Sequence, residues 1–205
     1  MSSRIRVLAA ALLVIVATPI AAQMGFSPGF AFLKAVRERD ANTATTLTQP
    51  GSAVINSRDA SSGDGALHIL VRGRDQAWLG FMLSRGARPD LQNNQGATAL
   101  LLAAQIGWRE GAELLLSARA NPNVANNSGE TPLIYAVRRF DAPMVRLLMS
   151  RGADPNQTDS LSGYSALDYA RQDRRGQPLI PVLEARQQQR PTQPVQGPPA
   201  PRQQP

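Results

Sequence analysis

The chain has 205 residues with a formal net charge of +7, and none of the residues is cysteine. The lack of cysteine excludes disulfide bonds, zinc sites with thiolate ligands, cysteine nucleophiles and lipid attachment at a bacterial lipobox. The length suits one ordinary domain, and a hydrophobic content of 42% is enough to build its core.

The first predicted element is an export signal at residues 1–22. Arg4 and Arg6 give it a positive start, and residues 7–16 form an apolar run, followed by small residues that allow cleavage before Gln23. This run is shorter than the roughly 20 residues of a membrane-spanning helix, so a cleaved signal is favoured over a retained anchor. We therefore expect a periplasmic protein, with secretion as the alternative and no stable membrane insertion after cleavage. Loss of Arg4 and Arg6 lowers the net charge from +7 to +5.

Residues 63–185 then repeat with a period of about 33 residues, in two short patterns that recur in register. In the first pattern a glycine precedes a leucine by four positions, at residues 63–68, 96–101, 129–134 and 163–168. In the second, Ser-x-x-Ala-x-Pro is followed by Asp or Asn, at residues 84–90, 117–123 and 150–156. A fixed period of this size indicates a stacked array in which each unit covers the apolar face of its neighbour.

Each unit is predicted to hold two short helices. Thr98, Thr131 and Ser165 stand at N-cap positions in front of the first helix. The second helix carries a pair of bulky residues, at 82–83, 115–116, 148–149 and 182–183. Gly86 and Gly152 supply the left-handed conformation that ends this second helix.

This pattern resembles the ankyrin repeat, through Thr98-Ala99-Leu100, Thr131-Pro132-Leu133, residues 152–156 and the spacing. The resemblance implies an all-α repeat solenoid of about five helix-turn-helix units, with β-turn or hairpin fingers and atypical caps at both ends. The predicted units are residues 23–62 as a degenerate first repeat, then 63–95, 96–128, 129–162, and 163–186 as the C-terminal cap.

The chain departs from the ankyrin pattern in three ways that affect its backbone and the contacts between units. The usual histidine remains only as His68. Its equivalents in the other units are Leu101, Ile134 and Asp168, so those units are expected to lose one inter-unit hydrogen bond. Arg119 occupies a glycine position, where a positive φ costs about 1 kcal/mol. Phe140 stands where a glycine usually closes the first helix.

The sequence offers little for catalysis. His68 is the only histidine and is interpreted as structural. Glu110 and Glu113 lie one helical turn apart, a spacing that suits a solvated helix face as well as an acid–base pair. Phosphate-binding and hydrolase motifs are absent from the sequence. We predict no enzyme, no cofactor and no metal site; the alternative is an envelope enzyme or small-ligand-binding protein with an unrecognised site.

Residues 187–205 are rich in Pro and Gln and are predicted to form a disordered tail. The spacing of Pro198 and Pro201 would also suit a Pro-rich ligand, but a flexible tail is favoured. Basic residues are interspersed with acidic ones, and the only adjacent pairs are Arg138-Arg139 and Arg174-Arg175. Nucleic acid is therefore not a predicted partner.

The ankyrin resemblance implies that the fingers and the first helices form a concave face that binds one or more proteins. By repeat position, the candidate partner-binding residues are Arg72, Asp75, Asn94, Gln105, Ile106, Trp108, Asn127, Arg138, Arg139 and Asp141. Our hypothesis is that Trp108 is an exposed anchor for a partner with an acidic patch. The alternative is that Trp108 packs on the first helix of the next unit and covers Phe140. Trp78 is assigned to the core, and the chain is expected to be a monomer.

Overall fold

The computed structural model describes residues 27–49 and 52–185, which form paired short helices. The α-helices are α1 (Pro28–Glu38), α2 (Ala41–Leu47), α3 (Ala66–Arg72), α4 (Gln76–Ser84), α5 (Ala99–Ile106), α6 (Arg109–Ser117), α7 (Pro132–Arg138), α8 (Ala142–Ser150), α9 (Ala166–Gln172) and α10 (Ile180–Glu184). Two 3-10 helices, η2 (Ala53–Asn56) and η3 (Arg174–Leu179), lie between them. The predicted export signal and the predicted tail at 187–205 lie outside the described residues.

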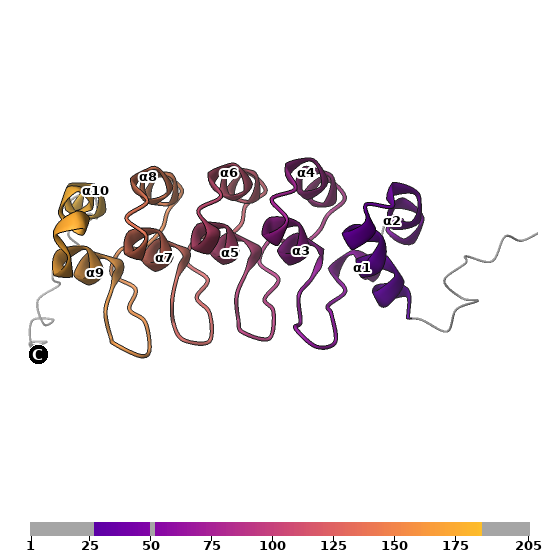
Figure 1. The fold of residues 1–205 in the computed structure, drawn as a ribbon, viewed down its shortest axis with the longest axis horizontal. Helices are drawn as coiled ribbons and strands as arrows, with labels where there is room; N and C mark the ends of the chain where they lie inside the picture. Colours follow the sequence, from indigo (N-terminus) through magenta and orange to yellow (C-terminus); the bar gives the residue numbers. More distant parts are fainter. Residues whose placement is uncertain (1–26, 50–51, 186–205) are drawn as a thin grey trace, which may run out of the picture.

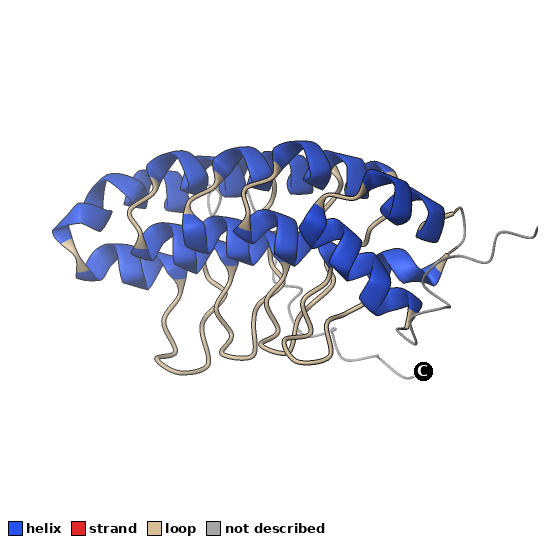
Figure 2. Ribbon diagram, turned by 45° about the vertical axis from the view of Figure 1, so that its right-hand side comes forward, coloured by secondary structure: helices blue, strands red, loops and turns tan. Residues whose placement is uncertain are grey.

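The helices stack in two layers along one axis. The odd-numbered helices form one layer and the even-numbered helices the other, while long loops project from the odd-numbered layer (Figures 1 and 2). Each odd-numbered helix contacts the next in its layer, from α1 through α9. The predicted fold class, an all-α repeat solenoid, is therefore confirmed. Within the described ranges, every helix is too short or too polar to cross a membrane.

Capping side chains set where the first helices begin. The hydroxyls of Thr98, Thr131 and Ser165 each accept a hydrogen bond of 3.2 Å from the backbone amide three residues further on. Each hydroxyl thus satisfies one of the amides that a helix start leaves without a partner. Pro132 occupies the first turn of α7, where its missing N–H costs little. These predicted caps are confirmed.

The core runs as a continuous seam between successive units. In α5, Leu100, Ala103 and Ala104 are fully buried, and Ala136 in α7 faces the same seam. The small alanines allow neighbouring helices to approach closely, so each unit completes the apolar face of the one before it. Trp78 differs from its prediction, because it is only half-buried and packs at the edge of this core.

The turns that close the first helices share a left-handed residue. Arg39, Arg74, Gly107 and Phe140 have φ values of 57°, 49°, 67° and 56°. Only one of these four residues is glycine, although a non-glycine residue in this conformation costs about 1 kcal/mol. The left-handed conformations expected at Arg119, with φ of 66°, and at Phe140 are confirmed.

The last helix pair departs from the others. A 3-10 helix, η3, joins α9 to the short α10, and it contains Pro178. Gly176 of η3 lies directly against the backbone of Ala170 in α9, where an added Cβ would overlap the chain. This close approach seats η3 and α10 on α9 and ends the stack.

Candidate functional site

The projecting loops that lead into α3, α5, α7 and α9 are here called the fingers. They share one internal hydrogen-bond pattern. In each finger the side chain of an Asp or Asn accepts two backbone amides of the same loop, at 2.6 to 3.1 Å. The residues that do this are Asp59, Asn93, Asn126 and Asp159. Such Asx turns hold a loop in one shape without a sheet. The fingers are loops in the described ranges, apart from an isolated antiparallel bridge between Thr158 and Ser165.

Hydrogen bonds also join each finger to the next. The backbone amides of Asn94, Asn127 and Ser160 donate to carbonyls of the preceding finger at 3.0, 3.0 and 2.8 Å. The side-chain amides of Asn94 and Asn127 add bonds of 2.9 and 3.0 Å to Ser61 O and Asn94 O. Asn94 and Asn127 are predicted to contact a partner; the structure places their side-chain amides in this ladder and leaves both residues exposed. The fingers are thus fixed relative to one another.

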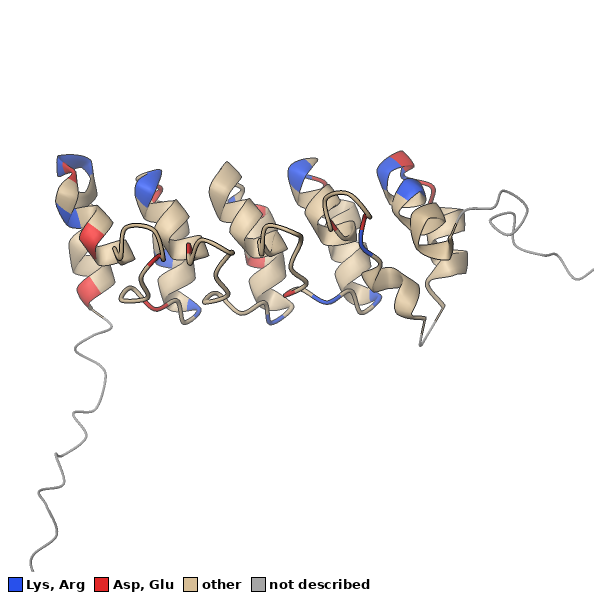
Figure 3. Cartoon of the chain, turned by 90° about the horizontal axis from the view of Figure 1, so that it is seen from below, with Lys and Arg blue, Asp and Glu red and all other residues tan. Residues whose placement is uncertain are grey.

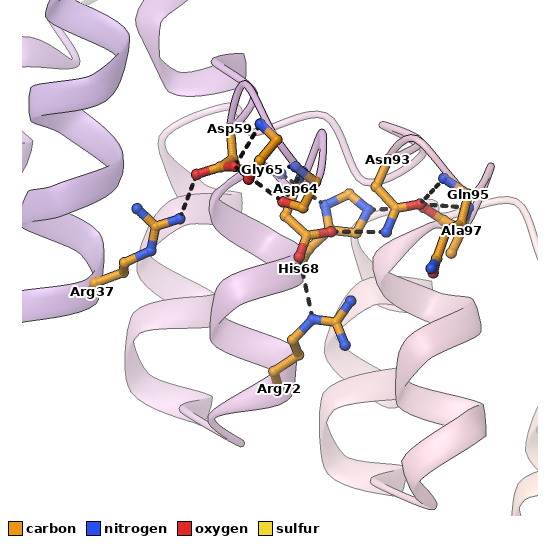
Figure 4. A network of polar contacts seen from close by, with 11 residues as sticks. Arg37, Asp59, Asp64, Gly65, His68, Arg72, Asn93, Gln95 and Ala97 are labelled. Atoms are coloured by element: carbon orange, nitrogen blue, oxygen red, sulfur yellow. Dashed lines mark hydrogen bonds and ion pairs between the residues drawn. The ribbon is translucent and has the colours of Figure 1, made fainter.

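His68 lies at the base of the first finger and links two units (Figure 4). Its Nδ1 accepts a hydrogen bond of 3.1 Å from the Gly65 amide, and its Nε2 lies 2.9 Å from the carbonyl of Ala97 in the next unit. The Nε2–H tautomer donates this second bond. Burial lowers the pKa of His68 below 6.5. Both ring nitrogens are used within the fold, which agrees with the structural role inferred from the sequence.

Ion pairs recur between a finger and the end of the first helix that follows it. Arg72 Nε lies 3.3 Å from Asp64 Oδ2, and Arg138 Nη1 contacts Glu130 Oε1 in the same way two units later. The equivalent positions in the unit between them hold Ala97 and Gln105, which carry no charge. Arg72 and Arg138 remain about half exposed, so both keep surface that a partner could reach.

The structure corrects the prediction that Trp108 is an exposed anchor. Its side chain is 5% exposed, so the hypothesis of an exposed anchor is wrong. The indole packs against Gly111, where any added Cβ would overlap the ring. Trp108 is the N-cap residue of α6, and Gly111 lies one turn into that helix. The glycine three residues after the tryptophan is the signal in the sequence that could have indicated burial.

Two further candidates stabilise helix starts. Asp75 and Asp141 cap α4 and α8, accepting hydrogen bonds of 3.1 and 3.0 Å from the amides three residues on. Asp75 also forms an ion pair with Arg39 at 2.7 Å. Both carboxylates therefore act within the fold.

The remaining candidates are Gln105, Ile106 and Arg139. Gln105 and Arg139 are exposed, and Ile106 is half-buried against the core. The structure adds two residues that the sequence analysis missed, because Leu161 is 91% exposed and Tyr164 is 43% exposed in the last finger. Leu161 stands at a fingertip position that holds polar residues in the other fingers. A bulky apolar residue in that polar context was the available signal.

Tyr164 is held by an aromatic contact. Its ring meets that of Tyr169 edge to face, with centroids 5.7 Å apart and an interplanar angle of 90°. The Arg138 guanidinium lies 5.5 Å from the Tyr169 ring centroid on the neighbouring unit. Tyr169 in turn donates a hydrogen bond of 2.6 Å to Asp159 at the base of the same finger. Tyr164 and Arg138 are thus connected through Tyr169, and Leu161 lies in the same finger as Tyr164.

Stacked helix pairs with a ladder of fingers define the helical repeat class of proteins. Within this class, residues 67–159 match the family model for ankyrin repeats, in three copies. That segment is similar to ankyrin repeats, and the flanking pairs α1–α2 and α9–α10 continue the same two layers. Repeat arrays of this kind present extended surfaces that bind other proteins.

Proposed function

We propose that this chain is a non-catalytic protein-interaction module of the cell envelope. It holds a partner protein against its fingers and first helices, as a scaffold, an assembly factor or an inhibitor. The observation that carries this proposal is the finger ladder, which fixes the backbone while leaving side chains such as Leu161 exposed. A fixed backbone with varied exposed side chains lowers the entropic cost of binding, because few groups must be ordered in the complex.

The proposed contact residues are all exposed in the structure. They are Arg72, Gln105, Arg138, Arg139, Leu161 and Tyr164. Tyr and Arg are enriched among residues that dominate binding energy at protein interfaces, and an exposed Leu beside them adds apolar area. Trp108 is not among the proposed contacts because its ring is buried.

The predicted export signal supports the envelope assignment, through the charged start and the apolar run of residues 1–22. Fractionation of cells that express the full chain tests it. We expect a shortened chain in the periplasmic fraction, and an unprocessed chain in the cytosol after Arg4 and Arg6 are changed to Glu. A chain that stays in the cytosol without those changes would refute the location.

Affinity capture from an envelope extract tests the binding function, with the full chain as bait. The partner found with the unchanged chain is then titrated against Leu161→Ser/Tyr164→Ser. We expect affinity to fall about tenfold because apolar and aromatic contact area is lost.

The matched control is Glu113→Ser/Arg146→Ser, which alters two exposed residues on the even-numbered helices α6 and α8. This control should leave affinity unchanged. Equal losses in the two double variants would show that the partner does not use the finger side.

A further inference from the structure

Basic residues gather at the turns that close the first helices, here called the closing turns. Viewed from the finger side, Lys and Arg colour the ends of α3 and α7 along one edge, and the end of α5 between them carries no such charge (Figure 3). The arginines concerned include Arg72 at the end of α3 with Arg74 after it, and Arg138 at the end of α7 with Arg139 after it. A row of this kind raises the question of what balances its charge.

At both ends of the row, carboxylates of the chain itself neutralise the arginines. Arg39 Nε lies 2.7 Å from Asp75 Oδ2. At the other end, Arg175 Nη2 lies 2.8 Å from Asp173 Oδ2, and its guanidinium lies 4.2 Å from the Phe140 ring centroid. These arginines are already engaged with groups of their own chain.

At the centre of the row, Arg72 and Arg138 are also paired, with Asp64 and Glu130. Arg74 and Arg139 differ. Arg74 Nη2 donates a hydrogen bond of 2.8 Å to the carbonyl of Ile106 in the next unit. From the opposite side, the Arg139 guanidinium lies on Gly107, with Nη2 only 3.0 Å from where a Cβ would stand. Two arginines from units on either side thus meet at one peptide of the central unit. Covalent geometry limits the separation of their Nη2 atoms to about 10 Å.

Neither of these two arginines is paired with a carboxylate in the part of the chain that the structure describes. Asp75 is engaged by Arg39, and Asp141 caps α8. Glu110 lies in the first turn of α6 and forms no ion pair with either arginine. Two like charges at most about 10 Å apart repel at ionic strengths below about 0.1 M, where the Debye length exceeds that distance, so an anion between them is favoured.

We propose that the partner places acidic side chains between Arg74 and Arg139, over the Ile106–Gly107 turn. This inference rests on the proposed protein-binding function and identifies the partner surface as an acidic segment of a protein. Guanidinium groups suit this role because they bind carboxylates through paired N–H donors. A Cβ at Gly107 would stand 3.0 Å from Arg139 Nη2, so a side chain at that position would shift the guanidinium.

A labelled peptide of alternating Glu and Gly is the probe, and fluorescence anisotropy with the full-length chain measures its affinity. Arg74→Gln/Arg139→Gln should weaken binding about fivefold, since each exposed charge pair contributes modestly. Gly107→Ala should also weaken it, because Arg139 is displaced without loss of charge. Circular dichroism verifies that each variant remains folded.

Arg85→Gln/Arg151→Gln is the matched control. These residues follow the second helices α4 and α8 of the same two units, so the same charge is removed at the far end of each pair. The control should keep the affinity of the unchanged chain. The proposal is overturned by equal losses in both double variants, by the absence of measurable binding, or by equal affinity for the matching Gln peptide.

The last binding measurement uses vesicles of anionic lipid. If they bind more tightly than the peptide through the same arginines, the ligand is a lipid surface and the proposal is overturned. None of these outcomes depends on the capture experiment with finger variants. The acidic-segment inference can therefore fail while protein binding stands, and protein binding can fail without affecting the peptide result.

Discussion

The fingers and the closing turns both contain a residue at positive φ, but they use different residue types for it. Each finger places glycine at a positive φ, at Gly63, Gly96, Gly129 and Gly163, whereas the closing turns use Arg39, Arg74 and Phe140 at three of four positions. The difference follows from space. A Cβ on Gly96 would overlap the side chain of Asn127 in the next finger, and a Cβ on Gly129 would stand 2.6 Å from the Ser160 amide. Glycine is required where two loops touch, and the closing turns tolerate strain because their side chains gain contacts.

Those contacts compensate for the strain. Arg74 donates to the Ile106 carbonyl, Arg39 pairs with Asp75, and the Phe140 ring receives Arg175. Each strained residue therefore joins its own unit to the next. Strain of about 1 kcal/mol can be offset by one charge-assisted hydrogen bond or cation–π contact.

The largest expected effect tests the role of space at the fingers. Gly96→Ala should reduce the free energy of unfolding by about 3 kcal/mol, because it combines a positive φ with overlap against Asn127. Gly163→Ala is the control, since its φ is 68° but no atom lies within 4 Å of the new Cβ. That change should cost only about 1 kcal/mol. Urea unfolding of the full chain measures both, and equal losses would contradict the argument from space.

His68 offers a test of how the fingers are held at their base. His68→Leu should cost about 2 kcal/mol, because the Gly65 amide and the Ala97 carbonyl lose their partner. The pH dependence is a second measure. Since burial lowers the pKa of His68 below 6.5, the unfolded chain takes up the proton first as pH falls.

The contribution of His68 is therefore complete above pH 6.5 and declines below it. The slope of stability between pH 6.5 and about 5 should be smaller in His68→Leu, because carboxylates titrate mainly below that window. Identical slopes in the two chains would show that His68 is not held neutral by its surroundings.

A smaller effect separates compensated from uncompensated strain. Arg119→Gly should stabilise the chain by about 1 kcal/mol, because it relieves a positive φ of 66° at the end of a second helix. Phe140→Gly relieves the same strain but removes the contact with Arg175, so its net effect should be near zero. Thermal unfolding compares the two variants. An equal gain at both positions would show that the Arg175 contact contributes nothing.

The smallest effect concerns the ion pair between a finger and its helix. Arg138→Gln should cost about 0.5 kcal/mol, since exposed pairs such as Arg138–Glu130 are weak. Added salt should reduce the difference from the unchanged chain. A salt-independent loss would instead indicate that the packing of Arg138 over Tyr169 is the important contact.

The period of the sequence predicted the backbone well. Capping residues, turn glycines and the strained positions at Arg119 and Phe140 depend on local conformation, which repeats every unit and is visible in register. Side-chain contacts between units were harder to predict. The burial of Trp108 depends on Gly111 three residues away, and the meeting of Arg74 and Arg139 depends on the exact stacking of three units. The exposure of Leu161 depends on the shape of the last finger, which the pattern shared by the repeats does not show.

Successive fingers are joined by bonds that recur one repeat length apart. The bond from Asn127 to the Asn94 carbonyl reproduces the bond from Asn94 to the Ser61 carbonyl, each between residues 33 positions apart. Insertion or removal of one whole repeat would thus leave every finger with a suitable neighbour. Gene duplication can then lengthen the binding surface in fixed increments without a new core design, whereas an insertion of any other length would interrupt the ladder.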